Sequence, residues 1–599
     1  MFQSFEVMAR PEQGPPRLAL LREKMAAEGL DGVIVPRADA WQGEYVAPCD
    51  ARLAWLTGFT GSAGFAVVLR DVAGVFVDGR YRVQVRAQVA DVFTPVDWPE
   101  VKPGDWLAAQ LPQGGVVGYD PWLHSVDEIE KLERALAGKG IILRGGQNLV
   151  DRIWHDRPAP PDAPFSARPE ALAGKSHSER CARIGAALAA EGAGAAVITL
   201  PDSIAWLLNI RGGDVRHNPV PQAFAILQAD GSCGLFARPG KADPVARHLG
   251  PQVRLHPEGD FLGAVGALRG VVRIDPASVP RIVADRLAAG GAEVQRGAEP
   301  CLLPKACKNA VEIAGTREAH LRDGAAMVQF LAWLDHEAPG GALTETGVVR
   351  SLEGFRRATN ALCDISFETI CGAGPHGAIV HYRVSEETDR PVRPGELLLI
   401  DSGGQYLDGT TDITRTVAVG PVPEGAAEDY TRVLKGMIAI SRLRFPRGIA
   451  GAHVDVLARV ALWQAGLDYD HGTGHGVGVY LSVHEGPQRI SRASDVALQP
   501  GMILSNEPGH YREGRWGIRI ENLIVVRQAP ELPGAEPRDW LDFETLTWVP
   551  LDRRLILPAM LDAAERAWVD AYHAGVLERI GPRVEGTARA WLIGACAPL

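Results

Sequence analysis

Residues 395–416 read GELLLIDSGGQYLDGTTDITRT, in which an apolar run ends at one aspartate and a glycine-rich loop returns the chain to a second aspartate. The run from Leu397 to Ile400 predicts a buried strand that ends at Asp401, and a second strand is expected to pass through Asp412. Two strands joined by a tight return place both carboxylates side by side. An aspartate at a strand end is more often a turn former, so this interpretation needs support from the rest of the chain.

Two later segments supply a further imidazole and a further carboxylate. HGTGHGVGVYLSVHEGP (471–487) sets His475 among five glycines. Glycine at this density lets the backbone approach a ligand closely and re-aims the side chains between. GMILSNEPGHY (501–511) places Glu507 at the end of an apolar strand, where the following proline and glycine fix the chain. A lone histidine is more often a satisfied core or surface residue, so these segments gain meaning only together.

A third segment, WGIRIENLIVV (516–526), alternates between apolar and polar residues in the manner of a strand. On such a strand Arg519, Glu521 and Leu523 share one face. Glu521 would face inward only if something pairs with its charge. An ordinary arginine–glutamate pair on an exposed strand face is the alternative interpretation.

Together the segments predict one metal site built from Asp401, Asp412, His475, Glu507 and Glu521. Four carboxylates and an imidazole would tolerate one another poorly in a shared pocket without cations. The donor set is mostly oxygen, with one nitrogen and no thiolate, which suits Mn, Co or similar ions better than structural zinc. Two such ions about 3.5–4 Å apart need bridging carboxylates and would hold a water between them as hydroxide. The segments therefore favour a hydrolase.

In their order and with their flanking glycines, the five positions resemble the aminopeptidase P branch of the creatinase/prolidase/methionine aminopeptidase (pita-bread) metallopeptidases. The similarity runs over nearly the full chain and points to the long, three-domain cytosolic form. This resemblance implies a metalloaminopeptidase that hydrolyses the bond between the first residue of a peptide and a proline in second position. It also implies two divalent ions, usually Mn²⁺, that activate the attacking hydroxide.

The resemblance also assigns roles within the site. Asp412 and Glu521 would bridge both ions, while Asp401 would bind one of them. Glu507 would be both a ligand and the general base that takes a proton from the bridging water. Arg519 would orient an acidic ligand by hydrogen bonding to it.

Three further histidines are expected to lie around the peptide, two of them by resemblance. His484, and His381 in GAIVHYRV (377–384), match histidines that contact the substrate, hold its scissile carbonyl and assist proton movement. His471 is expected to contact the substrate as well. An X-Pro bond is a tertiary amide without an N–H, so a peptidase that cleaves it needs a dedicated pocket.

Two alternatives differ from this function. A prolidase uses the same metal site but cuts only Xaa-Pro dipeptides, and the length of the chain, its duplicated front half and its carboxyl-terminal extension favour the aminopeptidase. Non-catalytic relatives keep the fold as a binding module, and creatinase works without metal. Such proteins have lost some or all of the ligands, whereas every ligand position is filled here.

Composition limits the partners of this chain. Its 599 residues, 46% hydrophobic and 23% charged, are too many for one core and predict about three or four domains. A net charge of −11 without a Lys/Arg cluster argues against a nucleic-acid interface. No apolar run reaches the roughly 18–20 residues of a membrane span, and residues 1–17 lack the apolar core of a signal peptide. A cytoplasmic protein with eight mostly buried, reduced cysteines and no membrane contact is expected.

The first half of the chain contains two stretches that look like copies of one unit. RLALLREKMAAEGLDGVIVP (17–36) and RCARIGAALAAEGAGAAVITLP (180–201) each predict an amphipathic helix and then a strand that ends near a proline. A further helix in each copy carries a tryptophan, Trp55 or Trp206. This order fits two consecutive α/β domains.

The expected fold class is α/β and α+β, with two tandem creatinase-like amino-terminal domains, a pita-bread catalytic domain and a helical carboxyl-terminal extension. Proline-rich and cysteine-containing linkers suggest the following domain ranges: 1–160, 161–303, 304–550 and 551–599. Residues 311–338 predict one long helix that opens the catalytic domain. By resemblance the last domain helps to form a homodimer, and a helical cap without a partner is the alternative.

Overall fold

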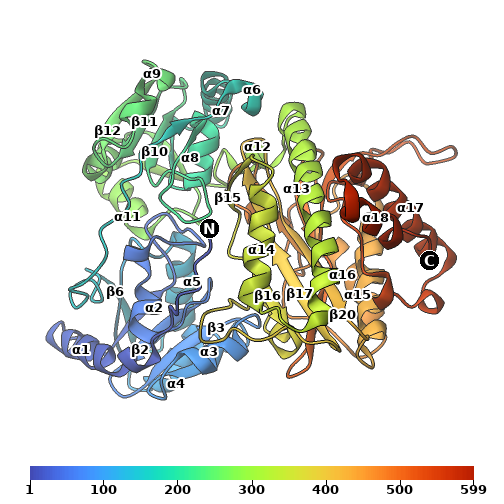
Figure 1. Cartoon of the computed structure of the whole chain (residues 1–599). Helices are drawn as coiled ribbons and strands as arrows, with labels where there is room; N and C mark the ends of the chain where they lie inside the picture. The colour runs from blue at the N-terminus through green and yellow to red at the C-terminus, as the bar shows by residue number, and fades with distance from the viewer. The chain divides into compact units, whose positions relative to one another are not determined.

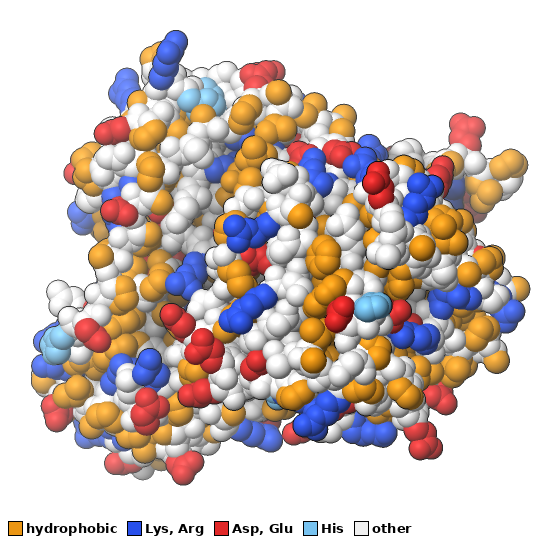
Figure 2. All heavy atoms as spheres, viewed as in Figure 1, with side chains coloured by type: hydrophobic (Ala, Val, Ile, Leu, Met, Phe, Trp, Pro, Cys, Tyr) orange, Lys and Arg blue, Asp and Glu red, His pale blue; other side chains and the backbone are white.

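The computed structural model describes residues 1–599, which form two compact units. The amino-terminal unit comprises Met8–Leu302, and the carboxyl-terminal unit comprises Met1–Val7 together with Leu303–Leu599. In Figure 1 the first is coloured blue to green and the second mainly yellow to red. On the face shown in Figure 2, cationic and anionic side chains are interspersed, with no large field of either sign. No helix combines the length and apolar character that a membrane crossing requires.

The amino-terminal unit contains two six-stranded sheets with the same topology, which confirms the predicted duplication. Their strand orders are β4-β3-β2-β1-β5-β6 and β12-β11-β10-β8-β13-β14. In both sheets the first strand along the chain pairs antiparallel with one neighbour and parallel with the other. The strands are β1 Gly32–Pro36, β2 Phe65–Leu69, β3 Ala73–Val77, β4 Thr94–Asp97, β5 Gly115–Tyr119, β6 Ile141–Gly145, β8 Ala195–Ile198, β10 Phe224–Gln228, β11 Cys233–Ala237, β12 Val253–Pro257, β13 Val271–Ile274 and β14 Glu293–Arg296.

The duplication extends to side-chain contacts of the helices. Arg17 of α1 lies over the Trp55 ring of α2 at 4.3 Å, and Arg180 of α7 lies over the Trp206 ring of α8 at 4.4 Å. Each arginine also donates to the backbone carbonyl of its tryptophan. The helices of this unit are α1 Gly14–Ala27, α2 Arg52–Thr57, α3 Arg82–Gln88, α4 Pro103–Gln110, α5 Val126–Leu136, α6 Glu170–Ala173, α7 His177–Ala190, α8 Pro201–Leu208, α9 Ala246–Leu249, α10 Phe261–Ala267 and α11 Arg281–Gly290. Two short strands, β7 Ser166–Ala167 and β9 Ile210–Arg211, pair with each other.

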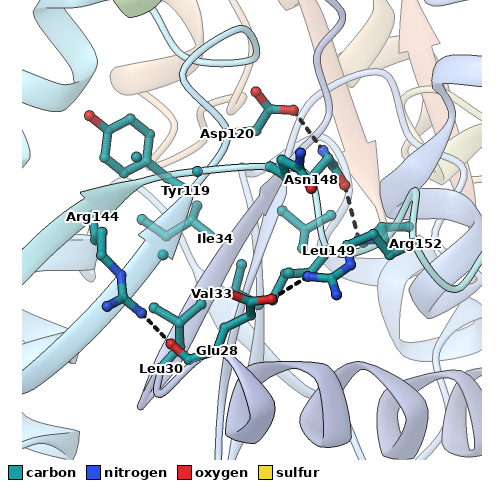
Figure 3. A pocket seen from close by; sticks show the side chains of 16 residues that line it. Glu28, Leu30, Val33, Ile34, Tyr119, Asp120, Arg144, Asn148, Leu149 and Arg152 are labelled. Atoms are coloured by element: carbon teal, nitrogen blue, oxygen red, sulfur yellow. Dashed lines mark hydrogen bonds and ion pairs between the residues drawn. The ribbon is translucent and has the colours of Figure 1, made fainter.

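A cavity of about 170 Å³ lies beside β1, β5 and β6 in the first copy. Figure 3 shows its lining, in which Arg152 pairs with Glu28 and Asn148 donates to Asp120 at 3.0 Å. Both acidic side chains of the lining therefore have partners already. No histidine or cysteine lines the cavity, so it offers no set of metal ligands and no nucleophile–base pair.

The carboxyl-terminal unit has a six-stranded sheet of order β21-β28-β27-β24-β22-β23 and a three-stranded sheet of order β16-β17-β20. A second three-stranded sheet, β15-β18-β19, and the hairpin β25-β26 complete it. The strands are β15 Leu362–Ile365, β16 Ile370–Ala373, β17 Glu396–Ser402, β18 Gly404–Tyr406, β19 Gly409–Thr410, β20 Ile413–Val419, β21 Arg444–Pro446, β22 Gly474–Gly476, β23 Glu485–Ile490, β24 Ile503–Asn506, β25 Gly509–Arg512, β26 Trp516–Arg519, β27 Asn522–Gln528 and β28 Trp540–Thr545.

Helices pack against these sheets through apolar side chains. The long helix predicted over 311–338 is confirmed as α13, whose first turn is capped by the Asn309 side chain. Met327 and Phe330 of this helix are fully buried among residues of α14, β16 and β17. In Figure 1, α13 and α14 run side by side next to these strands. The helices are α12 Leu302–Ala306, α13 Ala310–Glu337, α14 Glu345–Arg357, α15 Ala426–Ser441, α16 Gly451–Trp463, α17 Ala563–Ile580 and α18 Gly586–Ala595.

The carboxyl-terminal extension is helical and forms part of the core of its unit. Val569, Tyr572 and Val576 of α17 are buried in the same apolar cluster as Tyr430 and Val433 of α15. Burial of this kind fixes α17 on the rest of the unit through the hydrophobic effect. The extension is therefore an integral part of this core.

Candidate metal centre

The strand pair predicted from residues 395–416 is present and positions the first two carboxylates. Asp401 lies in β17, directly opposite Thr414 of β20 in an antiparallel register. Asp412 lies immediately before β20 rather than within it. Both carboxylates are buried, with 8% and 3% of the residue surface exposed for Asp401 and Asp412.

An imidazole and a third carboxylate approach from the six-stranded sheet. His475 lies in β22, and its Nε2 is 3.5 Å from Asp412 Oδ2 and 3.3 Å from Glu507 Oε1. Its Nδ1 lies 2.9 Å from the carbonyl oxygen of Gly476. A proton on Nδ1 would donate to that carbonyl and leave Nε2 free to bind a metal. Glu507 follows β24, and its Oε1 accepts a hydrogen bond from Ser505 Oγ at 3.0 Å.

Glu521 reaches the cluster by a route that the sequence did not predict. The expected continuous strand over 516–526 is wrong, because β26 ends at Arg519 and β27 begins at Asn522. β26 pairs with β25, whereas β27 pairs with β24 and β28. At the break, the Glu521 N–H donates to Thr414 O at 3.1 Å, and Thr414 Oγ1 donates to Glu521 Oε2 at 2.7 Å. The alternating segment 516–526 forms two strands because the residues before the break and those after it pair with different strands.

The ligand atoms of these side chains lie within 4.8 Å of one another in overlapping groups of three. The groups are Asp401, Asp412 and Glu521; His475, Glu507 and Glu521; and Asp412, His475 and His484. All five predicted metal ligands thus lie in one cluster. His484 belongs to it as well, with its ring centroid 4.3 Å from that of His475.

The other two candidate histidines lie outside these groups. His381 occupies a turn just after the 3-10 helix Gly374–Ala378 and is partly exposed. His471 Nε2 is 2.9 Å from the hydroxyl of Tyr511, and its Nδ1 is 2.8 Å from the carbonyl oxygen of Gly472. Their contact with a substrate stays a prediction.

Arg519 and Tyr511 connect His471 to the cluster of ligand atoms by hydrogen bonds. The buried Arg519 guanidinium donates to Asp401 Oδ2 at 2.6 Å and to the Tyr511 hydroxyl at 2.6 Å. No sequence pattern marks Tyr511 as part of the site, although it lies only four residues after Glu507 in segment 501–511. The hydrogen bond from Arg519 engages Asp401 Oδ2, whereas Asp401 Oδ1 has no hydrogen-bond partner.

The electrostatics of the cluster fit bound cations. Asp401 Oδ1, Asp412 Oδ1 and Glu521 Oε1 are buried without a hydrogen-bond partner. Burial, above all, raises the pKa of Asp401 to about 6, and burial with the charges of Asp412 and Glu507 raises the pKa of Glu521 well above its usual value. Unpaired buried carboxylate oxygens are costly unless a proton or a cation compensates them. Three of them in one pocket provide a donor set for divalent metal ions.

Known proteins resemble this chain along its whole length. The probable Xaa-Pro aminopeptidase P of Aspergillus fumigatus is 39% identical over 610 residues, which covers 97% of this chain and 92% of the fungal protein. Residues 314–528 match metallopeptidase family M24. The chain belongs to this family. Within this M24 protein, residues 17–153 and 156–312 each match a creatinase/prolidase N-terminal domain, and residues 539–599 match the C-terminal region of peptidase M24.

Two further relatives of the M24 chain are also described as Xaa-Pro or X-prolyl aminopeptidases, and a third is described as a dipeptidase. The probable Xaa-Pro aminopeptidase P of Paracoccidioides brasiliensis is 39% identical and covers 94% of this chain and 95% of its own. The crystal structure of X-prolyl aminopeptidase from Caenorhabditis elegans, described as a cytosolic enzyme with a di-nuclear active site, superposes with a TM-score of 0.93 at 33% identity. It covers 98% of this chain and 100% of the nematode chain. Dipeptidase PepE from Mycobacterium ulcerans is 26% identical with a TM-score of 0.50 and covers 64% of this chain.

Proposed function

We propose that this M24 protein is a metal-dependent aminopeptidase that removes the first residue of a peptide when the second residue is proline. The observation that carries the proposal is similarity to Xaa-Pro aminopeptidases over 97% of the chain, both amino-terminal domains included. The dipeptidase, by contrast, covers 64% of the chain. The clustered carboxylates supply the hydrolytic centre that such an activity needs.

The centre holds two divalent cations, by analogy with the di-nuclear active site described for the nematode relative. Their ligands are Asp401, Asp412, His475, Glu507 and Glu521, and the preferred ion is Mn²⁺. By resemblance to the aminopeptidase P family, Asp412 and Glu521 would be shared by both ions, and each contributes a ligand atom to two of the three groups, as His475 also does. When bound, such a pair of ions lowers the pKa of a water and neutralises negative charge that develops on a carbonyl oxygen.

The chain's own residues bind the peptide and move its protons. Glu507 is partly exposed, and its carboxylate accepts a proton from the attacking water and passes it on towards the leaving proline nitrogen. His484, which lies against His475, and His381 contact the substrate and donate to its scissile carbonyl oxygen as charge develops there. His471 contacts the substrate at the edge of the site. Arg519 holds Asp401 in orientation through its 2.6 Å hydrogen bond.

The substrate class is peptides with a free amino terminus and proline in second position, by analogy with the Xaa-Pro aminopeptidases that the chain resembles. The scissile X-Pro amide is tertiary and has no N–H, so a site that cleaves it cannot use that donor to hold the substrate. A prolidase restricted to Xaa-Pro dipeptides is the second candidate function, and a non-catalytic binding protein is the third.

A single assay separates these functions. The purified full-length protein is incubated with Arg-Pro-Pro and, separately, with Arg-Pro, in added Mn²⁺ and in a chelator. Release of arginine from the tripeptide that depends on metal supports the aminopeptidase. Cleavage of the dipeptide alone would establish a prolidase, and failure to cleave either would refute both.

The arrangement of domains, the assembly and the location complete the proposal. The ranges 1–160, 161–303, 304–550 and 551–599 are supported by the four family matches, which begin at residues 17, 156, 314 and 539. The protein acts in the cytoplasm as a homodimer, without nucleic-acid or membrane partners. Equilibrium sedimentation of the full-length protein tests the dimer.

A further inference from the structure

Arg415 is a buried cation whose contacts are all neutral. It is 1% exposed and lies in β20, three residues after Asp412. Its Nε donates to Pro550 O at 3.1 Å, and its Nη1 donates to Thr414 O at 2.9 Å. Its remaining hydrogen bonds run to Glu521 O, Asn522 Oδ1, Val549 O and the Tyr572 hydroxyl, at 2.6, 2.8, 2.8 and 3.0 Å. Arginine supplies five N–H donors in a rigid planar fork, and here all of them are engaged.

The shortest of these contacts ends on a predicted metal ligand. Glu521 lies in the break between β26 and β27, outside both strands. Its N–H donates to Thr414 O, and its carbonyl oxygen accepts from the Arg415 side chain. Arg415 Nη1 donates to the Glu521 carbonyl oxygen at 2.6 Å, and Nη2 donates to the side chain of the next residue, Asn522. The guanidinium therefore takes the place of a strand neighbour and holds the Glu521 backbone at the residue whose carboxylate points into the cluster. Charge-assisted hydrogen bonds of this type are about twice as strong as neutral ones.

The far side of Arg415 is held by the carboxyl-terminal extension. Tyr572 of α17 is 4% exposed, and its hydroxyl accepts from Arg415 Nη2 and from the Val549 N–H at 3.2 Å. The same hydroxyl donates to the carbonyl oxygen of Val549 at 2.8 Å. The ring is stacked between Trp548 and Trp568, at centroid distances of 5.6 and 5.2 Å. Two flanking rings leave the phenol little freedom to move, so its hydroxyl is a fixed partner for the guanidinium.

We propose that Arg415 and Tyr572 are positioning residues for Glu521, so that the carboxyl-terminal extension takes part in the metal centre. The inference deepens the proposed function, on whose metal site it rests. Neither side chain touches the substrate or the ions; each acts by fixing the backbone from which the Glu521 carboxylate projects. If Tyr572 positions Glu521 in this way, the carboxyl-terminal extension is needed for metal binding as well as for stability.

The size of the effect follows from other metal sites. Removal of a group that orients a metal ligand typically weakens metal affinity by about 10–100-fold. Arg415→Lys keeps the positive charge but offers one ammonium group in place of the planar fork, so it cannot serve Glu521, Asn522 and Pro550 together. A weaker affinity in this variant would report geometry, since the charge near the cluster is unchanged.

The experiment measures Mn²⁺ affinity by isothermal titration of the full-length, metal-stripped protein, together with its melting temperature without metal. Tyr572→Phe removes only the hydroxyl and is expected to weaken Mn²⁺ binding about tenfold, with Arg415→Lys at or above that loss. Ile580→Ala is the matched control, because Ile580 is buried in the same helix and the same apolar cluster but neither stacks on Tyr572 nor bonds to Arg415. This control is expected to lower the melting temperature without a change in affinity.

Two results would overturn the inference. One is Mn²⁺ affinity in Tyr572→Phe equal to that of the wild type, which would leave the hydroxyl a purely structural role. The other is an equal loss of affinity in Ile580→Ala, which would trace the effect to general loosening of α17. Failure of the proposed function would look different, because wild-type protein would then bind Mn²⁺ weakly or leave Arg-Pro-Pro uncleaved.

Discussion

The apparent affinity for metal should rise steeply with pH, because metal binding must displace a proton from His475. Burial by itself lowers the pKa of this imidazole, but its hydrogen bond to Asp412 and the charges of Glu507 and Asp412 raise the pKa to about 9 in the metal-free protein. At pH 7 the ring is then protonated, whereas only a neutral imidazole binds a metal ion. Each metal-binding event at this pH therefore releases at least one proton.

The magnitude follows from linkage between protons and metal. One displaced proton changes the apparent affinity by a factor of about ten, or about 1.4 kcal/mol, for each pH unit below the pKa. Between pH 6 and pH 8 this amounts to a gain of about 100-fold. Glu521, whose pKa burial and neighbouring carboxylates raise well above its usual value, adds to the slope in the same direction. Asp401, with a pKa of about 6, makes the dependence steeper still at lower pH.

Isothermal titration of metal-stripped protein with Mn²⁺ measures both quantities. Titrations at pH 6, 7 and 8 give the affinity, and titrations at pH 7 in two buffers of different ionisation enthalpy count the protons released. His573→Gln is the control, since burial lowers the pKa of His573 to about 4 and that ring is neutral at pH 7 already. An affinity that is flat between pH 6 and pH 8, with no proton released, would refute the reasoning about His475.

Three further predictions address other residues. Glu507→Gln should bind metal but lose at least about 100-fold in kcat on Arg-Pro-Pro, as expected for a general base; a near-wild-type kcat at equal metal content would remove Glu507 from that role. Arg519→Lys should lower Mn²⁺ affinity about 10–100-fold, because a single ammonium cannot bond Asp401 and Tyr511 with the same geometry; unchanged affinity would contradict the orienting role. His573, with a folded pKa of about 4 against 6.5 for an ordinary histidine, stays neutral in the fold while the unfolded chain takes up a proton. Its contribution to stability is thus complete above about pH 6.5 and is lost as the pH falls, by about 2 kcal/mol at pH 5. Chemical denaturation should show that the free energy of unfolding of His573→Gln falls by about 2 kcal/mol less than that of the wild type when the pH is lowered to 5. An equal loss in both proteins would contradict this contribution of His573.

Much of this protein can be predicted from local pattern. The duplicated front half follows from the repeated order of helix, strand and tryptophan-bearing helix, and the structure has the same strand order in both copies. The helix over 311–338 follows from its 3.6-residue periodicity and its asparagine cap. The five clustered ligands could be named only from the segments taken together and from their resemblance to a known family, because a single aspartate at a strand end or a single histidine is usually not a metal ligand.

Long-range contacts decided the rest. The alternation of residues 516–526 predicts one strand, yet the chain changes partners there, and a change of partner leaves no mark on the period of the sequence. Arg415 and Tyr572 lie 157 residues apart, and Tyr511 and His471 lie 40 apart. The sequence thus determined which groups could bind metal, because that is a property of the side chains themselves. Only the tertiary structure determined how they are aimed and supported, because hydrogen bonds between remote residues depend on packing that no local pattern encodes.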